Sequence, residues 1–293
     1  LAPMILRNLA TIGNINVVPE LIKRLKREPL VDLEQCNQSG YESNVSRIAA
    51  TLAVLGGPTA SKALIERSWE AIVRECPYAW KLEELKKRSW SEYYDSKERH
   101  QVDTCTDLAR ALGFCADKAA VKPLVRALIS GDEYLTRVAG ESLERLTNHH
   151  FGFSKLEKPG EPTGREEETS LNVATGAWRV WYEANLHQSY DDWIRNGFAE
   201  AGLDVYPASD PTKLKTLIQG LSDLRENVRY NCYMELGSRT GQWFFRDRIR
   251  AFHSPVDYCY AAARYRSWLA KRTSPLIWDD KVRCFNETRS SEP

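Results

Sequence analysis

Histidine and paired aspartates are the residues of this chain best suited to acid-base or metal chemistry. Among five histidines, His149-His150 is the only adjacent pair. Neighbouring side chains at a helix end diverge instead of facing one metal ion, and a helix C-terminus, which favours cations, explains the pair more simply. Asp191-Asp192 and Asp279-Asp280 each precede or open a predicted helix, where acidic groups complement the helix dipole. The sequence therefore favours helix capping over catalysis and predicts no metal site.

Cysteine usage indicates free thiols. The chain has seven cysteines, an odd number, and no C-x-x-C pair. Cys105, Cys115 and Cys232 lie in helical apolar patterns, where a thiol packs like a small hydrophobic residue. We therefore expect neither a disulfide framework nor a zinc site, and a reducing cytoplasm is the setting that fits best.

Motifs and charge narrow the function classes further. No nucleophile elbow, phosphate-binding loop, zinc-protease helix or dinucleotide fingerprint occurs in the sequence. We therefore expect no enzyme activity and no cofactor. A formal net charge of +1 over 293 residues is small for a protein whose main partner is nucleic acid. No apolar run approaches the roughly 20 residues of a membrane-spanning helix, so no membrane span is predicted.

Short amphipathic helices in pairs dominate the apolar pattern. Leu108, Leu112 and Cys115 recur at helical spacing, a polar turn follows at Asp117-Lys118, and the same period restarts at Val121. Two other stretches have apolar residues at equivalent positions: LATIGNINVVPELIKRL from Leu9 and LAVLGGPTASKALIERS from Leu52. Three copies of one helical hairpin predict a repeat protein in which each hairpin buries its apolar face against its neighbours.

Together with LGFCADKAAVKPLVRAL from Leu112, these runs resemble the HEAT repeat of bacterial HEAT-repeat proteins. The resemblance implies an all-α fold, a right-handed α-α superhelix of about six stacked helical hairpins. No convincing period-two alternation predicts a strand anywhere in the chain. The resemblance also implies that the second helix of each hairpin lines the concave side of the stack.

The pattern divides the chain into four segments. Residues 1–153 are predicted to hold the HEAT-like repeats, lengthened by a helical insertion at 76–100. Residues 154–170 are charged, contain Pro and Gly and have little to bury, which predicts a mobile loop. Residues 171–272 are predicted to form variant HEAT-like hairpins. Residues 273–293 are predicted to form a polar C-terminal tail. Only a few of its side chains could pack against the rest of the chain: Leu276, Ile277, Trp278 and Phe285.

Two distant helical segments have similar residue patterns. The residues from Val228 to Gly241 follow the pattern of those from Thr136 to Asn148, and a Phe and a Trp-bearing helix come after each. Four tryptophans are predicted to fill the interior of these variant hairpins: Trp178, Trp181, Trp243 and Trp268.

Basic residues recur on the second helices of the three hairpins. The predicted site comprises Lys23, Arg24, Arg27, Arg67, Lys122 and Arg126. We hypothesise that they form a basic stripe on the concave side that receives an acidic partner surface or a phosphate backbone. The alternative is a solvated face whose cations lie near helix C-termini.

The insertion at 76–100 is rich in aromatic residues. Its candidate binding residues are Trp80, Trp90, Tyr93 and Tyr94. They suggest an extra helix with an aromatic side, which either covers an exposed edge of the stack or protrudes to bind a partner.

The favoured function is a non-catalytic scaffold that binds another protein, as a subunit of a larger complex, through the concave face or the insertion. The alternative is a nucleic-acid-binding protein or a DNA glycosylase, because some glycosylases are built from HEAT-like repeats. That function needs a basic channel into which a Trp and a carboxylate point. A third class is a lyase or chaperone for a bound pigment, since related repeats occur in phycobilin-attaching proteins.

Overall fold

The computed structural model describes residues 15–30, 43–76, 84, 87, 89, 96–153, 167–244, 255–272 and 274–287. This part of the chain is mostly α-helical, as predicted. The chain divides into two compact units. Unit 1 consists of Leu1–Leu146, Phe151–Ser154 and Pro162–Leu186, and unit 2 of Thr147–His150, Lys155–Glu161 and His187–Pro293.

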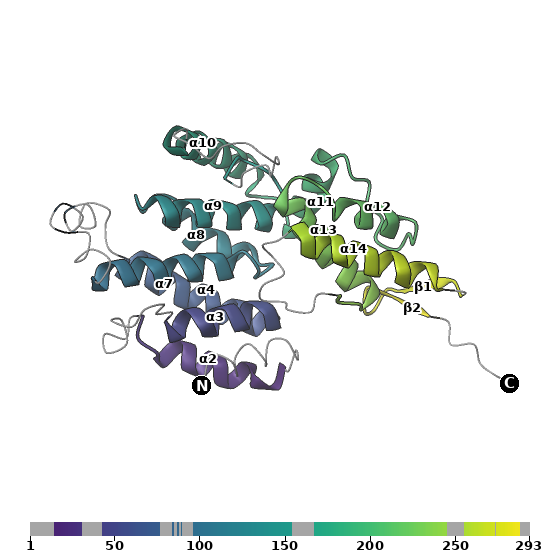
Figure 1. Ribbon diagram of the computed structural model, residues 1–293, viewed down its shortest axis with the longest axis horizontal. Coiled ribbons are helices and arrows are strands. Elements are labelled where there is room, and N and C mark those ends of the chain that lie inside the picture. Colours follow the sequence, from purple (N-terminus) through teal and green to yellow (C-terminus); the bar gives the residue numbers. More distant parts are fainter. Residues whose placement is uncertain are drawn as a thin grey trace. The chain divides into compact units, whose positions relative to one another are not determined.

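Unit 1 is built from helices, of which those from α2 to α8 pack on one another. Its elements are η1 (Ile15–Val17), α2 (Val18–Arg27), α3 (Asn44–Leu55), α4 (Pro58–Trp69), the π-helical turn η2 (Glu70–Glu75), α7 (Lys97–Leu112), η3 (Lys118–Ala120), α8 (Val121–Leu128), α9 (Glu133–Thr147, whose last residue belongs to unit 2) and α10 (Glu167–Asn185). Helix α2 packs on α3 and α4, α3 packs on α7, and α4 packs on both α7 and α8. Helices α2, α3 and α7 therefore lie side by side in chain order (Figure 1).

Local sequence signals set the ends of these helices. The Ser43 hydroxyl caps α3 by accepting the Ser46 N–H at 3.0 Å, and Ser96 caps α7 by accepting the Arg99 N–H at 3.1 Å. Between α3 and α4, Gly56 and Gly57 have φ values of 68° and 90°, which favour glycine, and Pro58 then opens α4. The predicted hairpin turn therefore has a direct chemical basis.

Unit 2 is arranged around one central helix, α13. Its elements are α11 (Tyr190–Glu200), α12 (Lys213–Gly220), α13 (Glu226–Thr240), α14 (Pro255–Ala270), β1 (Leu276–Asp279) and β2 (Cys284–Glu287). Helix α13 packs against α11, α12, α14 and β2. The core of this unit is strongly aromatic, with five rings that are at most 1% exposed: Trp193, Phe198, Tyr233, Tyr258 and Tyr265. Burial of these large rings positions the elements around α13.

The two helices whose sequences have similar patterns, α9 and α13, end in the same way. Helices α9 and α13 each have 15 residues. Each is followed by a left-handed residue, Asn148 with φ 58° and Gly241 with φ 66°. This agrees with the similarity of the two sequences, because Gly and Asn are the residues that adopt this helix-ending conformation most readily. The predicted interior positions of the tryptophans are met only in part. Trp178 is buried at 2% exposure, whereas Trp243 is 37% exposed.

A short β-hairpin corrects the prediction that the chain has no strands. Strands β1 and β2 pair antiparallel, with Leu276 opposite Glu287 and Asp279 opposite Cys284. Phe285, which is 5% exposed, packs edge-on against Trp278 with ring centroids 5.0 Å apart. The four-residue strands are too short for a period-two pattern to reveal them.

Asp279-Asp280 therefore does not open a helix, and this prediction was wrong. Asp279 ends β1 and Asp280 lies in the hairpin turn. The Asp279 carboxylate accepts the backbone N–H of Lys281 at 2.9 Å. Aspartate is common in such turns because its side chain can bond to the backbone two residues later.

Two helices overlap the ends of predicted segments. Helix α7 begins at Lys97, inside the predicted insertion at 76–100. Residues 154–166 of the predicted loop lie outside the described residues, as does the first predicted helix at 3–12. The last four residues of that loop are helical, because α10 begins at Glu167.

Candidate functional site

Helices α2, α4 and α8 of unit 1 expose one recurring set of positions. Leu21, Leu64 and Leu124 are equivalent and are each at most 1% exposed. Two residues after the leucine, each helix carries an exposed charged side chain: Lys23, Glu66 and Arg126. With 3.6 residues per turn, residues i and i+2 point to nearly opposite sides of a helix, so burial of the leucine exposes the charge. We call the exposed residues of α2, α4 and α8 the second-helix surface.

Most of the predicted basic residues lie on this surface. Four of the six are exposed: Lys23, Arg27, Lys122 and Arg126. Arg24 is half-buried, and its Nε lies 3.7 Å from Glu20 on the same helix. These four exposed residues therefore lie on the side of their helices opposite the buried leucines, with acidic side chains among them.

Arg67 is placed differently from the prediction. Its side chain is only 8% exposed, and its guanidinium lies 2.7 Å from a carboxylate oxygen of Glu70. It also donates to the backbone carbonyl of Glu28 at 3.0 Å. Arg67 therefore ties α4 to the end of α2 and does not offer its charge to a partner.

Contacts on the exposed side connect successive second helices. Lys26 of α2 lies 3.4 Å from Glu66 of α4, and the ammonium of Lys122 on α8 lies 4.9 Å from the centre of the Trp69 ring of α4. Exposed ion pairs and cation–π contacts contribute little stability. Their effect is to give the second-helix surface a mixed character, with cations, carboxylates and an indole ring side by side.

The aromatic residues of the insertion lie outside the described residues. This applies to Trp80, Trp90, Tyr93 and Tyr94. Partner binding by the insertion therefore stays a prediction.

His149 is buried in unit 2, which corrects its predicted role as a cation at a helix end. Its side chain is 3% exposed, and Nδ1 lies 2.5 Å from a carboxylate oxygen of Glu200. Burial lowers the pKa of His149 below its ordinary value of 6.5 and outweighs the opposite effect of Glu200. The imidazole is therefore neutral at neutral pH and acts as a buried hydrogen-bonding group.

The capping interpretation of Asp191-Asp192 is confirmed at Asp192. The Ser189 hydroxyl accepts the Asp192 N–H at 3.1 Å, and the Asp192 carboxylate accepts the Ser189 N–H at 3.2 Å. This reciprocal pair is a capping box at the start of α11. The hydrogen bonds from Ser189 lower the pKa of Asp192, so its carboxylate is charged at neutral pH.

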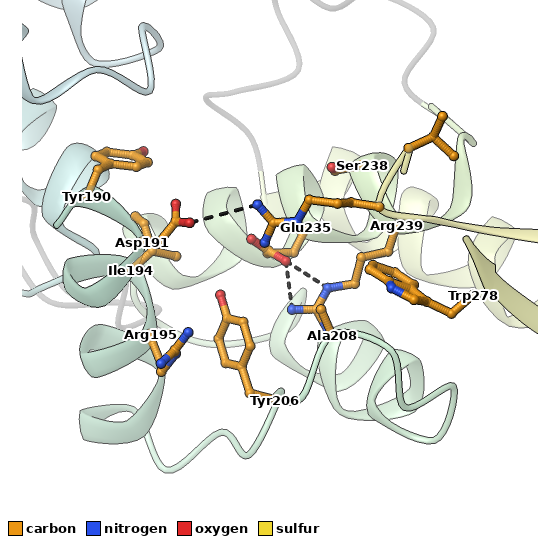
Figure 2. Close-up of a pocket in the computed structure, with 12 residues that line it drawn as sticks. Tyr190, Asp191, Ile194, Arg195, Tyr206, Ala208, Glu235, Ser238, Arg239 and Trp278 are labelled. Atoms are coloured by element: carbon orange, nitrogen blue, oxygen red, sulfur yellow. Dashed lines mark hydrogen bonds and ion pairs between the residues drawn. The ribbon is translucent and has the colours of Figure 1, made fainter. Parts of the chain in front are cut away.

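Unit 2 contains a pocket that the sequence did not indicate. Its volume is about 340 Å³, near the lower end of the range for small-molecule sites. Its walls come from α11, the segment between α11 and α12, α13 and the β1–β2 hairpin (Figure 2). The lining residues are Tyr190, Asp191, Ile194, Arg195, Tyr206, Ala208, Glu235, Ser238, Arg239, Trp278, Val282 and Arg283.

Tyr206 lies at the centre of this pocket between two guanidinium groups. The guanidinium carbons of Arg195 and Arg239 are each 5.0 Å from the centre of its ring, and the two side chains lie on either side of it in Figure 2. Burial, reinforced by the Glu235 carboxylate, raises the pKa of Tyr206 to about 12. The phenol therefore keeps its proton and can donate a hydrogen bond at neutral pH.

Arg239 is a buried support for this arrangement. Its side chain is 2% exposed, and Nε and Nη2 each lie 2.7 Å from one carboxylate oxygen of Glu235. Its Nη1 donates to the Val205 carbonyl at 2.7 Å. Hydrogen bonds of this charge-assisted kind fix the guanidinium plane, which in turn fixes the adjacent Tyr206 ring.

No protein-family model, curated protein or solved structure matches this chain.

Two further properties apply to the described residues only. There, no group of three or more His, Cys, Asp or Glu side chains is arranged to hold a metal ion. No helix of that part of the chain has the length and apolar character needed to cross a membrane. The six described cysteines are all free thiols, in agreement with the prediction for Cys105, Cys115 and Cys232.

Proposed function

We propose that the chain is a non-catalytic, HEAT-like scaffold that binds another protein through the second-helix surface of unit 1. The main support is the recurrence of a buried leucine followed by an exposed charged residue on α2, α4 and α8. These helices pack on one another and on the first helices of the hairpins in chain order. In a solenoid, helices repeated in this way present a continuous row of side chains to a partner.

The composition of the second-helix surface favours a protein as the partner. The exposed cations Lys23, Lys122 and Arg126 are interspersed with Glu20 and Glu66. Trp69 and Ile129, the latter 62% exposed, add apolar area near the ends of α4 and α8. A polyphosphate backbone selects a uniformly basic surface, whereas protein interfaces combine charges of both signs with aromatic and apolar anchors.

Charge reversal tests this proposal. We expect the triple variant K23E/K122E/R126E to lose roughly tenfold or more of its affinity for the partner, because like charges then face each other across the interface. Its unfolding free energy should change by no more than about 0.5 kcal/mol per substitution, since all three side chains are exposed. The measurement is quantitative affinity capture of a stoichiometric partner, together with thermal denaturation.

The matched control reverses three exposed lysines of unit 2, K215E/K271E/K281E. It changes the net charge equally and should retain the partner. Equal retention by both triple variants would exclude the second-helix surface as the binding site. Retention on DNA or heparin that falls steeply with salt, without a protein partner, would favour the nucleic-acid class instead.

A further inference from the structure

The pocket of unit 2 has an excess of positive charge that its own carboxylates do not neutralise. It is lined by three arginines, Arg195, Arg239 and Arg283, and by two carboxylates, Asp191 and Glu235. One carboxylate oxygen of Glu235 lies 2.7 Å from both Nε and Nη2 of the buried Arg239. Arg195 and Arg283 are therefore left with a single carboxylate of the lining, Asp191, between them.

The two outer arginines have only loose partners. Arg283 lies 3.9 Å from Asp191, and the two side chains are 69% and 67% exposed. Arg195 lies 4.0 Å from Asp192, and its side chain is 57% exposed. Ion pairs this long and this exposed contribute little. An incoming anion can therefore take over both guanidinium groups at little cost.

A cationic ligand fits this pocket poorly. Aromatic side chains can hold cations against their faces, but guanidinium groups already lie 5.0 Å from the Tyr206 ring centre on two sides. The Tyr206 hydroxyl, protonated at neutral pH, points into the space between α11 and α13 in Figure 2. A ligand entering that space meets hydrogen-bond donors from the phenol and from the arginines.

Two further aromatic side chains line the pocket. Tyr190 at the start of α11 and Trp278 on β1 lie on opposite sides of the Tyr206 hydroxyl (Figure 2). A volume of about 340 Å³ accommodates a ligand larger than an inorganic ion. The aromatic lining and this volume therefore favour a ligand that has an aromatic part in addition to the anionic group attracted by the arginines.

We propose that this pocket binds a small organic anion, with a phosphate or carboxylate group held by Arg195, Arg283 and the Tyr206 hydroxyl and an aromatic body in contact with the aromatic lining, Tyr190 or Trp278. This binding is independent of the protein partner proposed for unit 1. Arg239 and Glu235 serve as its base, because Glu235 and the Val205 carbonyl already hold the Arg239 guanidinium without a ligand.

Calorimetric titration of the full chain tests this proposal with four probes: phenyl phosphate, benzoate, inorganic phosphate and neutral benzyl alcohol. We expect at least one aromatic anion to bind, and to bind more tightly than inorganic phosphate and benzyl alcohol. The more tightly bound of phenyl phosphate and benzoate identifies the anionic group. Absence of binding by both at millimolar concentration, or equal affinity for inorganic phosphate, would overturn the proposal.

Variants locate the binding. Arg195→Gln and Arg283→Gln should each weaken the aromatic anion roughly tenfold, the usual loss when a hydrogen bond to a charged group is removed. Tyr206→Phe should weaken it by a smaller factor and leave the ring packing intact. The control is Arg179→Gln on α10 of unit 1, whose side chain is 77% exposed. Undiminished binding by the double variant R195Q/R283Q would place the anion elsewhere and contradict the proposal.

Discussion

Replacing Glu144 by alanine is expected to lower the unfolding free energy of unit 1 by about 2–4 kcal/mol. Glu144 is 1% exposed in α9. One of its carboxylate oxygens accepts the backbone N–H groups of Phe151, Gly152 and Phe153 at 2.6, 2.9 and 3.1 Å. Alanine leaves these donors without their acceptor, and a buried unpaired donor costs about 1–3 kcal/mol. The Gly152 N–H regains water most easily, because this residue is exposed.

Glu133→Ala on the first turn of the same helix is the matched control. Its side chain is 55% exposed and lies 3.9 Å from Arg137, so we expect a change within about 0.5 kcal/mol. Urea denaturation followed by circular dichroism gives the stabilities. Hydrogen exchange of the Phe151–Phe153 amides separates unit 1 from unit 2 and should accelerate in the Glu144 variant. Similar stabilities for the two variants would show that the Glu144 contacts contribute little.

Replacing Gly197 by alanine is expected to destabilise unit 2 by about 1–3 kcal/mol or more. A Cβ atom at this position of α11 would lie 2.3 Å from the carbonyl oxygen of Asn148, a backbone atom. Asn148 cannot move away easily, because its side chain donates to the Ile194 carbonyl at 3.1 Å and accepts from Asn231 at 3.1 Å. The added methyl must therefore shift α11 or break this buried network.

Gly176→Ala in α10 provides the comparison for this glycine. A Cβ atom there meets no atom within 4 Å. Because glycine is a poor helix former, alanine should leave stability unchanged or raise it by up to about 1 kcal/mol. The measurement is the denaturation midpoint of each variant, with hydrogen exchange to assign the transition to a unit. No loss of stability in Gly197→Ala, or a loss in Gly176→Ala alone, would contradict the described packing.

The helical hairpins of unit 1 could be predicted because their signal is local. Burial of Leu21, Leu64 and Leu124 follows from apolar spacing that is visible within a single helix. The capping role of Asp192 was equally accessible, since a capping box involves residues three positions apart. The β-hairpin was missed because its strands have only four residues each.

The pocket and the true role of Arg67 depend on contacts between residues far apart in the chain. From its position in the helical pattern, Arg67 is predicted to be a surface cation. Its contact with the Glu28 carbonyl depends on the packing of α4 against the end of α2, which the local pattern does not show. Tyr206 and Arg239 come from separate elements, and neither has a local pattern that differs from an ordinary surface residue. Of the lining residues, the sequence singles out Asp191, as a helix-capping carboxylate, and Trp278, as a side chain able to dock, but it gives no reason to place the two together.

Lysine footprinting of the complex is the most direct test of the second-helix surface. Acetylation of the chain with and without its co-purified protein partner, read by mass spectrometry, reports the exposure of each lysine side chain. Lys23, Lys62 and Lys122, all exposed on α2, α4 and α8, should lose reactivity in the complex. Lys215 and Lys271 of unit 2 should keep theirs. Unchanged reactivity of the first three lysines in a stoichiometric complex would contradict binding through this surface.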